Sequence, residues 1–260
     1  MARNNELGAA KTAKKDEFYT QLTDIEKEMR YYRKHFKGKT VLCNCDDPFE
    51  SNFFKYFVLN FNRLELKKLI ATCYATSPIM GSQLKYCMDA SGQMYISFDS
   101  ELTADNNTKR PYKAVVSVVY DKTGDGGVDM FDVAELFRSG ENQLTELSGD
   151  GDYRSDECLE LLQEADIVVT NPPFSKFREY VSTLIKYDKK FIIIGNINAA
   201  TYKETFPLIQ HNKMWLGASI HSGDRAFYVP DDYPLDAAGC GIDEITGRKF
   251  IRVKGVRWYT

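Results

Sequence analysis

Residues 39–74 read KTVLCNCDDPFESNFFKYFVLNFNRLELKKLIATCY and decide the predicted fold class. The apolar run at 39–45 predicts a buried strand, the stretch at 50–64 a largely buried helix, and 66–74 a second strand. The connections between these elements are short. A strand, a helix and a strand in this order are typical of a parallel sheet, because parallel strands need a crossover between them.

The same alternation continues towards the C-terminus. Ser155 begins one predicted helix, whose first-turn acidic residues suit the helix dipole. The further predicted strands are at 113–120, 166–170 and 189–199, and further helices are at 155–165 and after Phe174. Another helix is predicted to start with a Thr201/Glu204 capping box, before Pro207 disturbs it. We therefore predict an α/β fold with a mostly parallel, doubly wound sheet.

Three segments lie outside this predicted core. Residues 1–38 contain a helix from about Asp24 that stops at Gly38. Residues 75–111 form a polar insertion with one short alternating run, and 213–260 are typical of short β segments. We expect an N-terminal segment at 1–38 and one domain at 39–260, which carries the insertion at about 75–111 and a β-rich tail at about 213–260.

The composition, 43% hydrophobic and 27% charged over 260 residues, is ordinary for a globular protein. No run approaches the ~18 apolar residues of a membrane span, and the N-terminus lacks the apolar core of a secretory signal, so we expect a cytosolic protein. Six scattered cysteines without a C-x-x-C pair, and only three histidines, favour reduced thiols over a disulfide framework or a transition-metal site.

The net charge of -3 conceals an uneven distribution. Residues 121–166 carry three bases against fourteen acids, whereas 1–40 carry ten against six and 167–260 carry thirteen against nine. One interpretation is a solvated acidic face. The other is a polyanion that contacts the ends of the chain and avoids its middle, because phosphate binding depends on local positive charge.

Residues 165–181, ADIVVTNPPFSKFREYV, place two prolines at the end of a predicted strand, where the active sites of open parallel sheets lie. The prolines fix φ and remove two N–H donors, so the Asn171 carboxamide and the Pro172 carbonyl can act as rigid acceptors. An exocyclic amine offers two N–H groups to such a pair, and Phe174 can stack on a planar ring. The structural alternative is a rigid turn with a proline near the first helical position.

DIVVTNPPF at 166–174 resembles the catalytic motif of amino-methyltransferases that use S-adenosylmethionine, and AKKDEFYTQ at 13–21 resembles the cofactor motif of N6-adenine DNA methyltransferases. With CNCDDP, GDGGVDMFDVAELF, GDYRS and NPPFSKFREYV in the expected order, the chain from about Leu7 to Thr260 closely resembles the EcoRI-type adenine-specific DNA methyltransferase family. The resemblance implies a Rossmann-like methyltransferase fold and S-adenosylmethionine as the cofactor.

The resemblance also implies two sets of site residues. Those of the cofactor site are Phe18, Tyr19 and Thr20 beside its methionine part, Asp46, Asp47 and Pro48 at the first loop, and Asp152 and Tyr153 at its adenine. Those that grip the target adenine are Asn171, Pro172, Pro173 and Phe174. Core packing of Phe18 and Tyr19, and helix capping by the aspartates, are the structural alternatives.

The chain departs from the family pattern in three respects. The loop after Asp47 lacks the glycines that usually let backbone approach the cofactor. The second strand ends in ATCY without an acid, which leaves the partner of the ribose hydroxyls unidentified. Family members are generally longer, so we expect that C-terminal sequence involved in target recognition is missing.

Two further patterns each allow two interpretations. DKTGDGGVDMFD at 121–132 fits a calcium-loop template in part, but position 12 is Asp rather than Glu, so an Asp/Gly-rich turn that caps the next helix is the favoured interpretation. The basic run near the C-terminus predicts either a DNA-facing ribbon or a solvated hairpin, and its residues are Arg248, Lys249, Arg252, Lys254 and Arg257.

The resulting hypothesis is methyl transfer from S-adenosylmethionine to N6 of an adenine that is flipped out of double-stranded DNA. The partner is then duplex DNA, with a cognate restriction endonuclease in the same host that need not contact the protein. The alternatives are an amino-methyltransferase for RNA or protein, and a catalytically silent relative that binds DNA or calcium.

Overall fold

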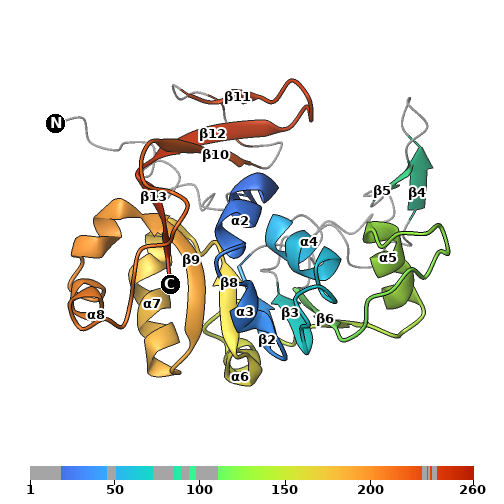
Figure 1. The fold of residues 1–260 in the computed structure, drawn as a ribbon, viewed down its shortest axis with the longest axis horizontal. Coiled ribbons are helices and arrows are strands. Elements are labelled where there is room, and N and C mark those ends of the chain that lie inside the picture. Colours follow the sequence, from blue (N-terminus) through green and yellow to red (C-terminus); the bar gives the residue numbers. More distant parts are fainter. Residues whose placement is uncertain are drawn as a thin grey trace. The chain divides into compact units, whose positions relative to one another are not determined.

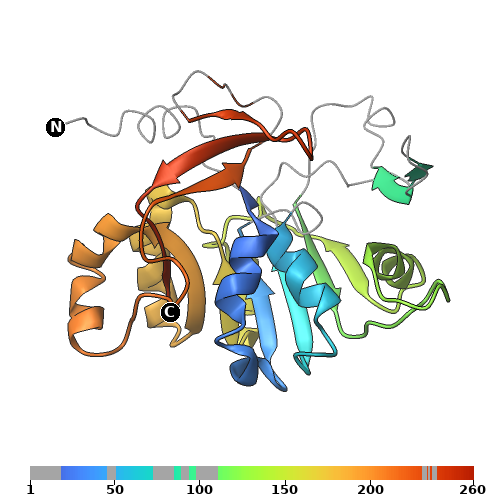
Figure 2. The same ribbon diagram turned by 45° about the horizontal axis from the view of Figure 1, so that its top comes forward.

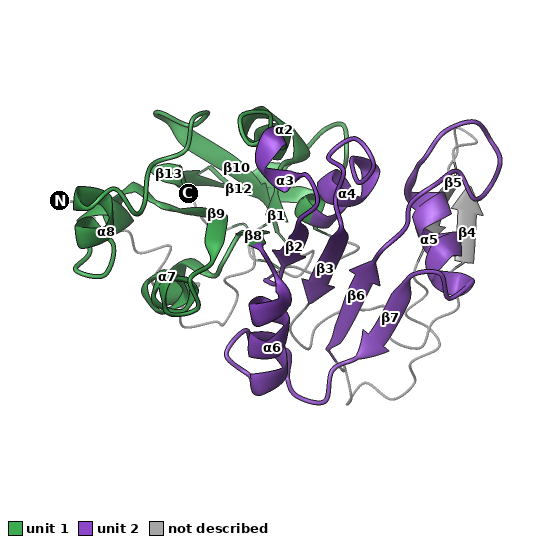
Figure 3. Ribbon diagram, turned by 60° about the horizontal axis from the view of Figure 1, so that its bottom comes forward, with its two compact units in different colours: residues 1–33, 50–53, 167–260 green, residues 34–49, 54–166 purple. Residues whose placement is uncertain are grey.

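The computed structural model describes residues 19–45, 51–72, 111–229, 233, 235 and 239–260, together with the backbone of 85–88 and 94–97. The chain forms two compact units (Figure 3). Unit 1 comprises residues 1–33, 50–53 and 167–260, and unit 2 comprises residues 34–49 and 54–166. The segment that follows the N-terminus therefore groups with the C-terminal part of the chain.

Unit 2 contains a mixed sheet. Parallel strands β2 (Thr40–Cys43) and β3 (Lys68–Thr72) are extended by β6 (Tyr112–Val116) and β7 (Gln143–Glu146), which pair antiparallel to β3 and β6. Its other elements are α3 (Arg33–Phe36), most of α4 (Asn52–Leu59), α5 (Met130–Arg138), α6 (Asp156–Glu164) and the antiparallel pair of β4 (Lys85–Met88) and β5 (Met94–Ser97). All four residues of β2 are buried, as expected for a strand covered on both faces.

Unit 1 contains the strand that leads into the Asn-Pro-Pro-Phe turn. Strand β8 (Ile167–Thr170) pairs parallel with β9 (Lys190–Asn196), and β13 (Val256–Tyr259) pairs antiparallel with β9 (Figure 1). The helical elements of this unit are α2 (Leu22–Met29), η2 (Phe174–Lys176), α7 (Phe177–Lys186), η3 (Ile197–Thr201) and α8 (Phe206–Gln210). Helix α7 packs closely on β9, because any Cβ at Gly195 would collide with the Phe177 ring.

A second sheet in unit 1 is antiparallel and has the strand order β1, β10, β12, β11. Its C-terminal strands are drawn in orange to red in Figure 2. Its strands are β1 (Tyr19–Thr20), β10 (Asp224–Tyr228), β11 (Gly241–Ile242) and β12 (Lys249–Lys254). Along β12, Ile251 and Val253 are buried while Arg252 and Lys254 are exposed, so one face packs inward and the other faces solvent.

Helix α2 is held to the C-terminal part of unit 1 by a buried carboxylate. Glu28 is fully buried and accepts from the backbone N–H groups of Ala218 and Ser219 at 2.8 and 2.7 Å. It also accepts from the Tyr32 hydroxyl at 2.6 Å. Gly217 must lack a side chain here, because a Cβ would collide with the Glu28 carboxylate. These hydrogen bonds to the Glu28 carboxylate fix α2, the helix that directly follows β1.

Several sequence-based predictions are confirmed. The strands predicted around 40, 70, 168 and 193 form as β2, β3, β8 and β9, and Ser155 caps α6 by accepting from the Cys158 backbone N–H. The sheets are mixed rather than mostly parallel, because β6, β7 and β13 run antiparallel to their neighbours. The insertion at 75–111 lies largely outside the described residues.

Two helix predictions were wrong in detail. The N-terminal helix is broken into α2 and α3, although Ile25, Met29 and Phe36 are buried as their spacing predicts. The Thr201/Glu204 box does not start a helix, because Thr201 ends η3 and α8 begins at Phe206, with Pro207 accommodated in its first turn. No helix in the described ranges is long and apolar enough to cross a membrane.

Candidate active site

The Asn-Pro-Pro-Phe turn lies where the sequence places it, at the carboxyl end of β8. All four residues of β8 are buried, and Asn171 is only 6% exposed. Pro173 is extended, with φ -53° and ψ 125°, and its carbonyl accepts from the Lys176 backbone N–H at 2.9 Å to close the turn η2. The two prolines therefore hold Asn171 at the buried end of the strand and start the next helix at once.

Phe174 contacts a residue that sequence inspection did not select. Its ring lies edge to face with Phe227 of β10, with centroids 6.3 Å apart and planes at 90°. Phe227 is 1% exposed and pairs directly with Thr20 of β1. Directly paired strand residues have neighbouring side chains on one face, so Phe227 lies between the N-terminal motif and the Asn-Pro-Pro-Phe turn.

Asn52 is a second residue that sequence inspection missed. Its Nδ2 donates to the Thr20 carbonyl at 2.7 Å, so the first turn of α4 fixes the backbone of the N-terminal motif. Both residues belong to unit 1. The only sequence signal is the position of Asn52 shortly after the first polar loop.

Three threonines end strands and share one feature. Thr20, Thr72 and Thr170 are the last residues of β1, β3 and β8, and each is at most 3% exposed. Within the described residues, none of their hydroxyls has a hydrogen-bond partner. A buried hydroxyl without a partner costs free energy unless a ligand or water satisfies it. Each of these hydroxyls can therefore serve a polar ligand at the end of its own strand.

Tyr19 lies on the opposite face of the second sheet from Thr20. The Arg248 guanidinium lies over the Tyr19 ring, 5.6 Å from its centroid, and over the Tyr228 ring at 4.8 Å. Tyr19 and Tyr228 are directly paired across β1 and β10. Phe18, Asp46, Asp47 and Pro48 lie outside the described residues.

Asp152 and Tyr153 belong to unit 2, in the loop before α6. The Asp152 carboxylate accepts from Nε and Nη2 of Arg154 at 2.8 and 2.6 Å, which is a bidentate ion pair. Tyr153 is 8% exposed, and the Arg154 guanidinium lies 5.6 Å from its ring centroid. An amine that binds to Asp152 would have to share this carboxylate with Arg154.

A hollow with a volume of about 320 Å³ adjoins this loop and is lined by Glu146, Leu147, Ser148 and Gly149. The Glu157 carboxylate accepts from the Ser148 backbone N–H at 2.7 Å and so fixes one wall.

The basic run near the C-terminus is divided between two sheets. Arg252 and Lys254 point from β12 to solvent, although Arg252 also lies 3.6 Å from the Asp224 carboxylate. Lys249 donates to the Tyr233 carbonyl at 3.3 Å, and Arg257, in β13, donates to the carbonyls of Val256 and His221 at 2.7 Å. β12 pairs antiparallel with both β10 and β11, so most of the run is one arm of a hairpin, whereas Arg257 belongs to β13, which pairs with β9.

The loop at 121–132 forms the Asp/Gly-rich turn that the sequence favoured. Asp121 accepts from the backbone N–H groups of Gly124 and Gly126 at 2.6 and 2.8 Å. Asp132 accepts from the backbone of Lys122, Thr123 and Asp129, each at 2.8 Å, and forms a capping box with Asp129 at the start of α5. In the part of the chain that is described, no group of three or more metal-ligating side chains is present.

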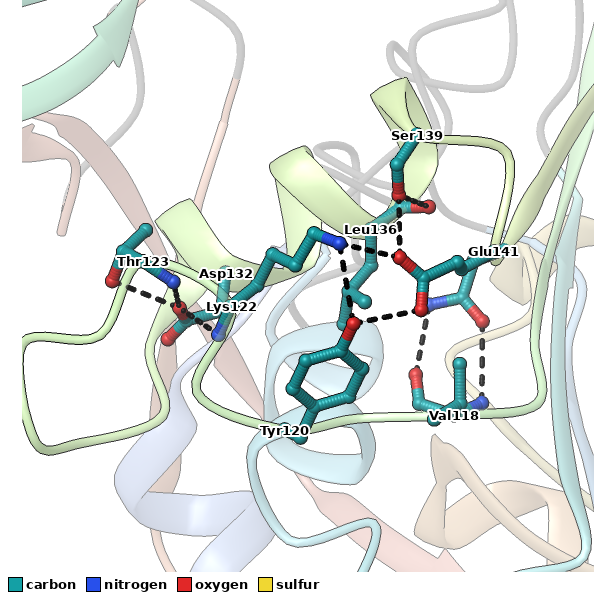
Figure 4. A network of polar contacts seen from close by, with 9 residues as sticks. Val118, Tyr120, Lys122, Thr123, Asp132, Leu136, Ser139 and Glu141 are labelled. Carbon is teal, nitrogen blue, oxygen red and sulfur yellow. Dashed lines mark hydrogen bonds and ion pairs between the residues drawn. The ribbon is translucent and has the colours of Figure 1, made fainter.

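This loop is fixed at its other end by Glu141 (Figure 4). The Glu141 carboxylate accepts from Lys122 Nζ at 2.6 Å, from the Tyr120 hydroxyl at 2.8 Å and from Ser139 Oγ at 2.9 Å. These bonds, with that from Lys122 the strongest, lower the pKa of Glu141 to about 2. The network is a structural part of unit 2.

An α/β fold in which a buried strand ends in Asn-Pro-Pro-Phe, with aromatic and hydroxyl side chains beside it, is typical of an amino-methyltransferase. Residues 6–260 match the family model of the adenine-specific methyltransferase EcoRI, and the chain belongs to this family. The family is that of type II DNA adenine methyltransferases.

Three curated relatives match nearly the whole chain. Type II methyltransferase M.EcoRI of Escherichia coli is 44% identical over 259 residues, which cover 100% of this chain and 69% of the relative. M.MgeORF184P of Mycoplasma genitalium and M.MpnI of Mycoplasma pneumoniae are 33% and 32% identical over 96% of the chain, which spans 63% and 62% of their length. No solved structure matches significantly.

Proposed function

We propose that the chain transfers a methyl group from S-adenosylmethionine to N6 of an adenine in double-stranded DNA. One observation carries the proposal: Asn171 is held at the buried end of β8 by two prolines, and Phe174 beside it is held by Phe227. A carboxamide oxygen, a carbonyl and an aromatic ring at one strand end suit a planar base with an exocyclic amine.

In this proposal the chain acts mainly by positioning. N6 is buried in the base stack, so the adenine must first be flipped out of the duplex, at a cost of a few kcal/mol. The Asn171 carboxamide oxygen and the Pro172 carbonyl accept hydrogen bonds from the two N6–H groups and so orient the nitrogen lone pair. Phe174 stacks on the adenine ring. The bound cofactor supplies an electrophilic methyl group. No residue of the chain becomes covalently modified.

The cofactor is proposed to be held by the strand-end residues. Thr20 and Thr170, both in unit 1, offer buried hydroxyls without partners among the described residues. Phe18, Tyr19, Asp46, Asp47, Pro48, Asp152 and Tyr153 keep the roles that the resemblance implies. The Asp152 carboxylate is shared with Arg154, so we expect it to bind the amine of the cofactor's adenine with moderate affinity.

The DNA contacts are proposed to centre on Arg252 and Lys254, which are the exposed cations of β12. Lys249 and Arg257 donate to carbonyl oxygens, so they would contact phosphate only with their remaining N–H groups. A Rossmann-like methyltransferase fold and the division of the chain at residue 39 are further parts of the proposal. So is a cognate restriction endonuclease in the host.

The substrate class is tested by incubating the purified chain with labelled S-adenosylmethionine and, separately, with duplex DNA, RNA and protein. The proposal predicts label in DNA alone, recovered as N6-methyladenine. Label in RNA or protein instead would assign the site to another amine. Calorimetry without nucleic acid distinguishes a silent relative, since no binding of the cofactor would contradict the proposal at its first step.

A further inference from the structure

Arg248 occupies a different environment from the other cations of the basic run. Its half-buried guanidinium lies over two aromatic rings, Tyr19 at 5.6 Å and Tyr228 at 4.8 Å. Tyr19 belongs to the N-terminal motif, and Tyr228 is its direct partner across β1 and β10. A cation over two rings is attracted by both and holds them in one arrangement.

The backbone that carries Arg248 is itself held in place. The Arg248 carbonyl accepts from the Asp243 backbone N–H at 2.9 Å, which closes the turn between β11 and β12. The Asp243 carboxylate accepts from the backbone N–H groups of Ile245 and Thr246, both at 3.0 Å, and from the Tyr228 hydroxyl at 2.9 Å. These bonds, with that from Thr246 the strongest, lower the pKa of Asp243. Tyr228 is therefore fixed at its ring by Arg248 and at its hydroxyl by Asp243.

We infer that Arg248 is a positioning residue for the cofactor motif: it holds the Tyr19 ring, and with it the β1 segment that ends in Thr20, in the arrangement that binds S-adenosylmethionine. This inference rests on the proposed function. It assigns Arg248 to the cofactor side of the protein, although the sequence alone groups it with DNA-contacting cations.

Arg252 provides a matched comparison, because it lies four residues after Arg248, on β12. It is an exposed arginine on β12, with an ion pair to Asp224 at 3.6 Å. Loss of a phosphate contact weakens DNA binding and reduces the slope of log K against log[salt] by about 1. Loss of a residue that positions the cofactor motif weakens cofactor binding without DNA present. The two roles therefore give separate readouts.

The test compares Arg248→Gln with Arg252→Gln in the full chain. Calorimetry measures the affinity for S-adenosylmethionine without DNA. Titrations with duplex DNA between 50 and 200 mM salt measure the salt slope. Over this range a protein with several phosphate contacts can lose about 10³–10⁵ in affinity. We expect Arg248→Gln to weaken cofactor binding about tenfold and to leave the salt slope unchanged. We expect Arg252→Gln to reduce the slope by about 1 and to leave cofactor affinity unchanged.

Tyr228→Leu keeps every cation and serves as a second variant if Arg248→Gln does not fold. It removes one of the two rings under Arg248, so the inference predicts weaker cofactor binding with an unchanged salt slope. Cofactor affinity within twofold of the wild type in the folded Arg248→Gln protein, or in Tyr228→Leu, would overturn the inference. A wild-type chain that binds no S-adenosylmethionine would instead overturn the proposed function.

Discussion

The Phe174 and Phe227 rings lie edge to face, 6.3 Å apart between centroids. Phe174 is the last of the proposed adenine-gripping residues, and Phe227 lies in a strand that pairs with the N-terminal motif. The aromatic contact, together with the pairing of Phe227 with Thr20, thus links the two sequence motifs on which the proposed function depends. A change at Phe227 should therefore affect the reaction although Phe227 itself lies outside both motifs.

Phe227→Leu should lower the free energy of unfolding by about 1–2 kcal/mol, because an edge-to-face contact and some buried area are lost. It should also lower kcat several-fold, because the Phe174 ring loses its support. Urea unfolding and steady-state methylation measure the two effects. Phe191→Leu is the control, because Phe191 is also buried but pairs with Val168, near the start of β8. A similar fall of kcat in both variants would contradict a specific role for Phe227.

Asn52→Ala should weaken binding of S-adenosylmethionine, because the Thr20 carbonyl loses the donor that lies 2.7 Å away. A buried acceptor left without a partner costs about 1–3 kcal/mol, which bounds the loss of affinity at roughly a hundredfold. Asn60→Ala removes a bond of the same type, from Nδ2 to the Tyr56 carbonyl at the C-terminal end of α4, and should leave the affinity unchanged. Calorimetry that finds equal affinities for the two variants would refute this role.

Glu28→Gln should destabilise unit 1 by about 2–3 kcal/mol. The carboxylate accepts from two backbone N–H groups and one hydroxyl, and a carboxamide would turn an NH₂ group towards one of these donors. Glu26→Gln is the control, because Glu26 lies on the same helix and is exposed. Denaturant unfolding should show a lower free energy of unfolding for Glu28→Gln alone. Equal free energies of unfolding for the two variants would contradict this role of the Glu28 carboxylate.

The stability of the chain should fall as the pH rises above about 10. Burial raises the pKa of Tyr259 to about 12, and in the unfolded chain a tyrosine titrates near about 10. The raised pKa means that the unfolded state loses its proton first, so stability present below pH ~10 is lost progressively towards pH ~12. Tyr259→Phe should flatten this decline, whereas Tyr31→Phe, at a residue that is 53% exposed, should not. Parallel declines in all three proteins would show that Tyr259 does not cause the loss.

The sequence predicts the elements whose signals are local. Apolar runs predict β2, β3, β8 and β9, because a strand buried on both faces must be apolar throughout. The Ser155 cap and the Asp/Gly-rich turn before α5 were also predictable, because a side chain that caps a helix bonds to backbone only a few residues away.

Strand pairing could not be predicted in the same way. β1 pairs with β10, and Thr20 with Phe227, across most of the length of the chain, and nothing in either short segment specifies the other. β6 runs antiparallel to β3, a direction that its apolar sequence does not specify. Phe227, Asn52 and the position of Arg248 follow from these pairings, so the residues around the predicted motifs required the structure.

The proposed activity is methylation of adenine in DNA, with Asn171 as the residue that binds the amine. The most direct measurement is the N6-methyladenine content of DNA from a host without adenine methylation of its own, after expression of the wild type or of Asn171→Ala. The claim predicts N6-methyladenine with the wild type, none with Asn171→Ala, and binding of S-adenosylmethionine by both purified proteins. N6-methyladenine formed by Asn171→Ala, or its absence with a wild-type chain that binds the cofactor, would contradict it.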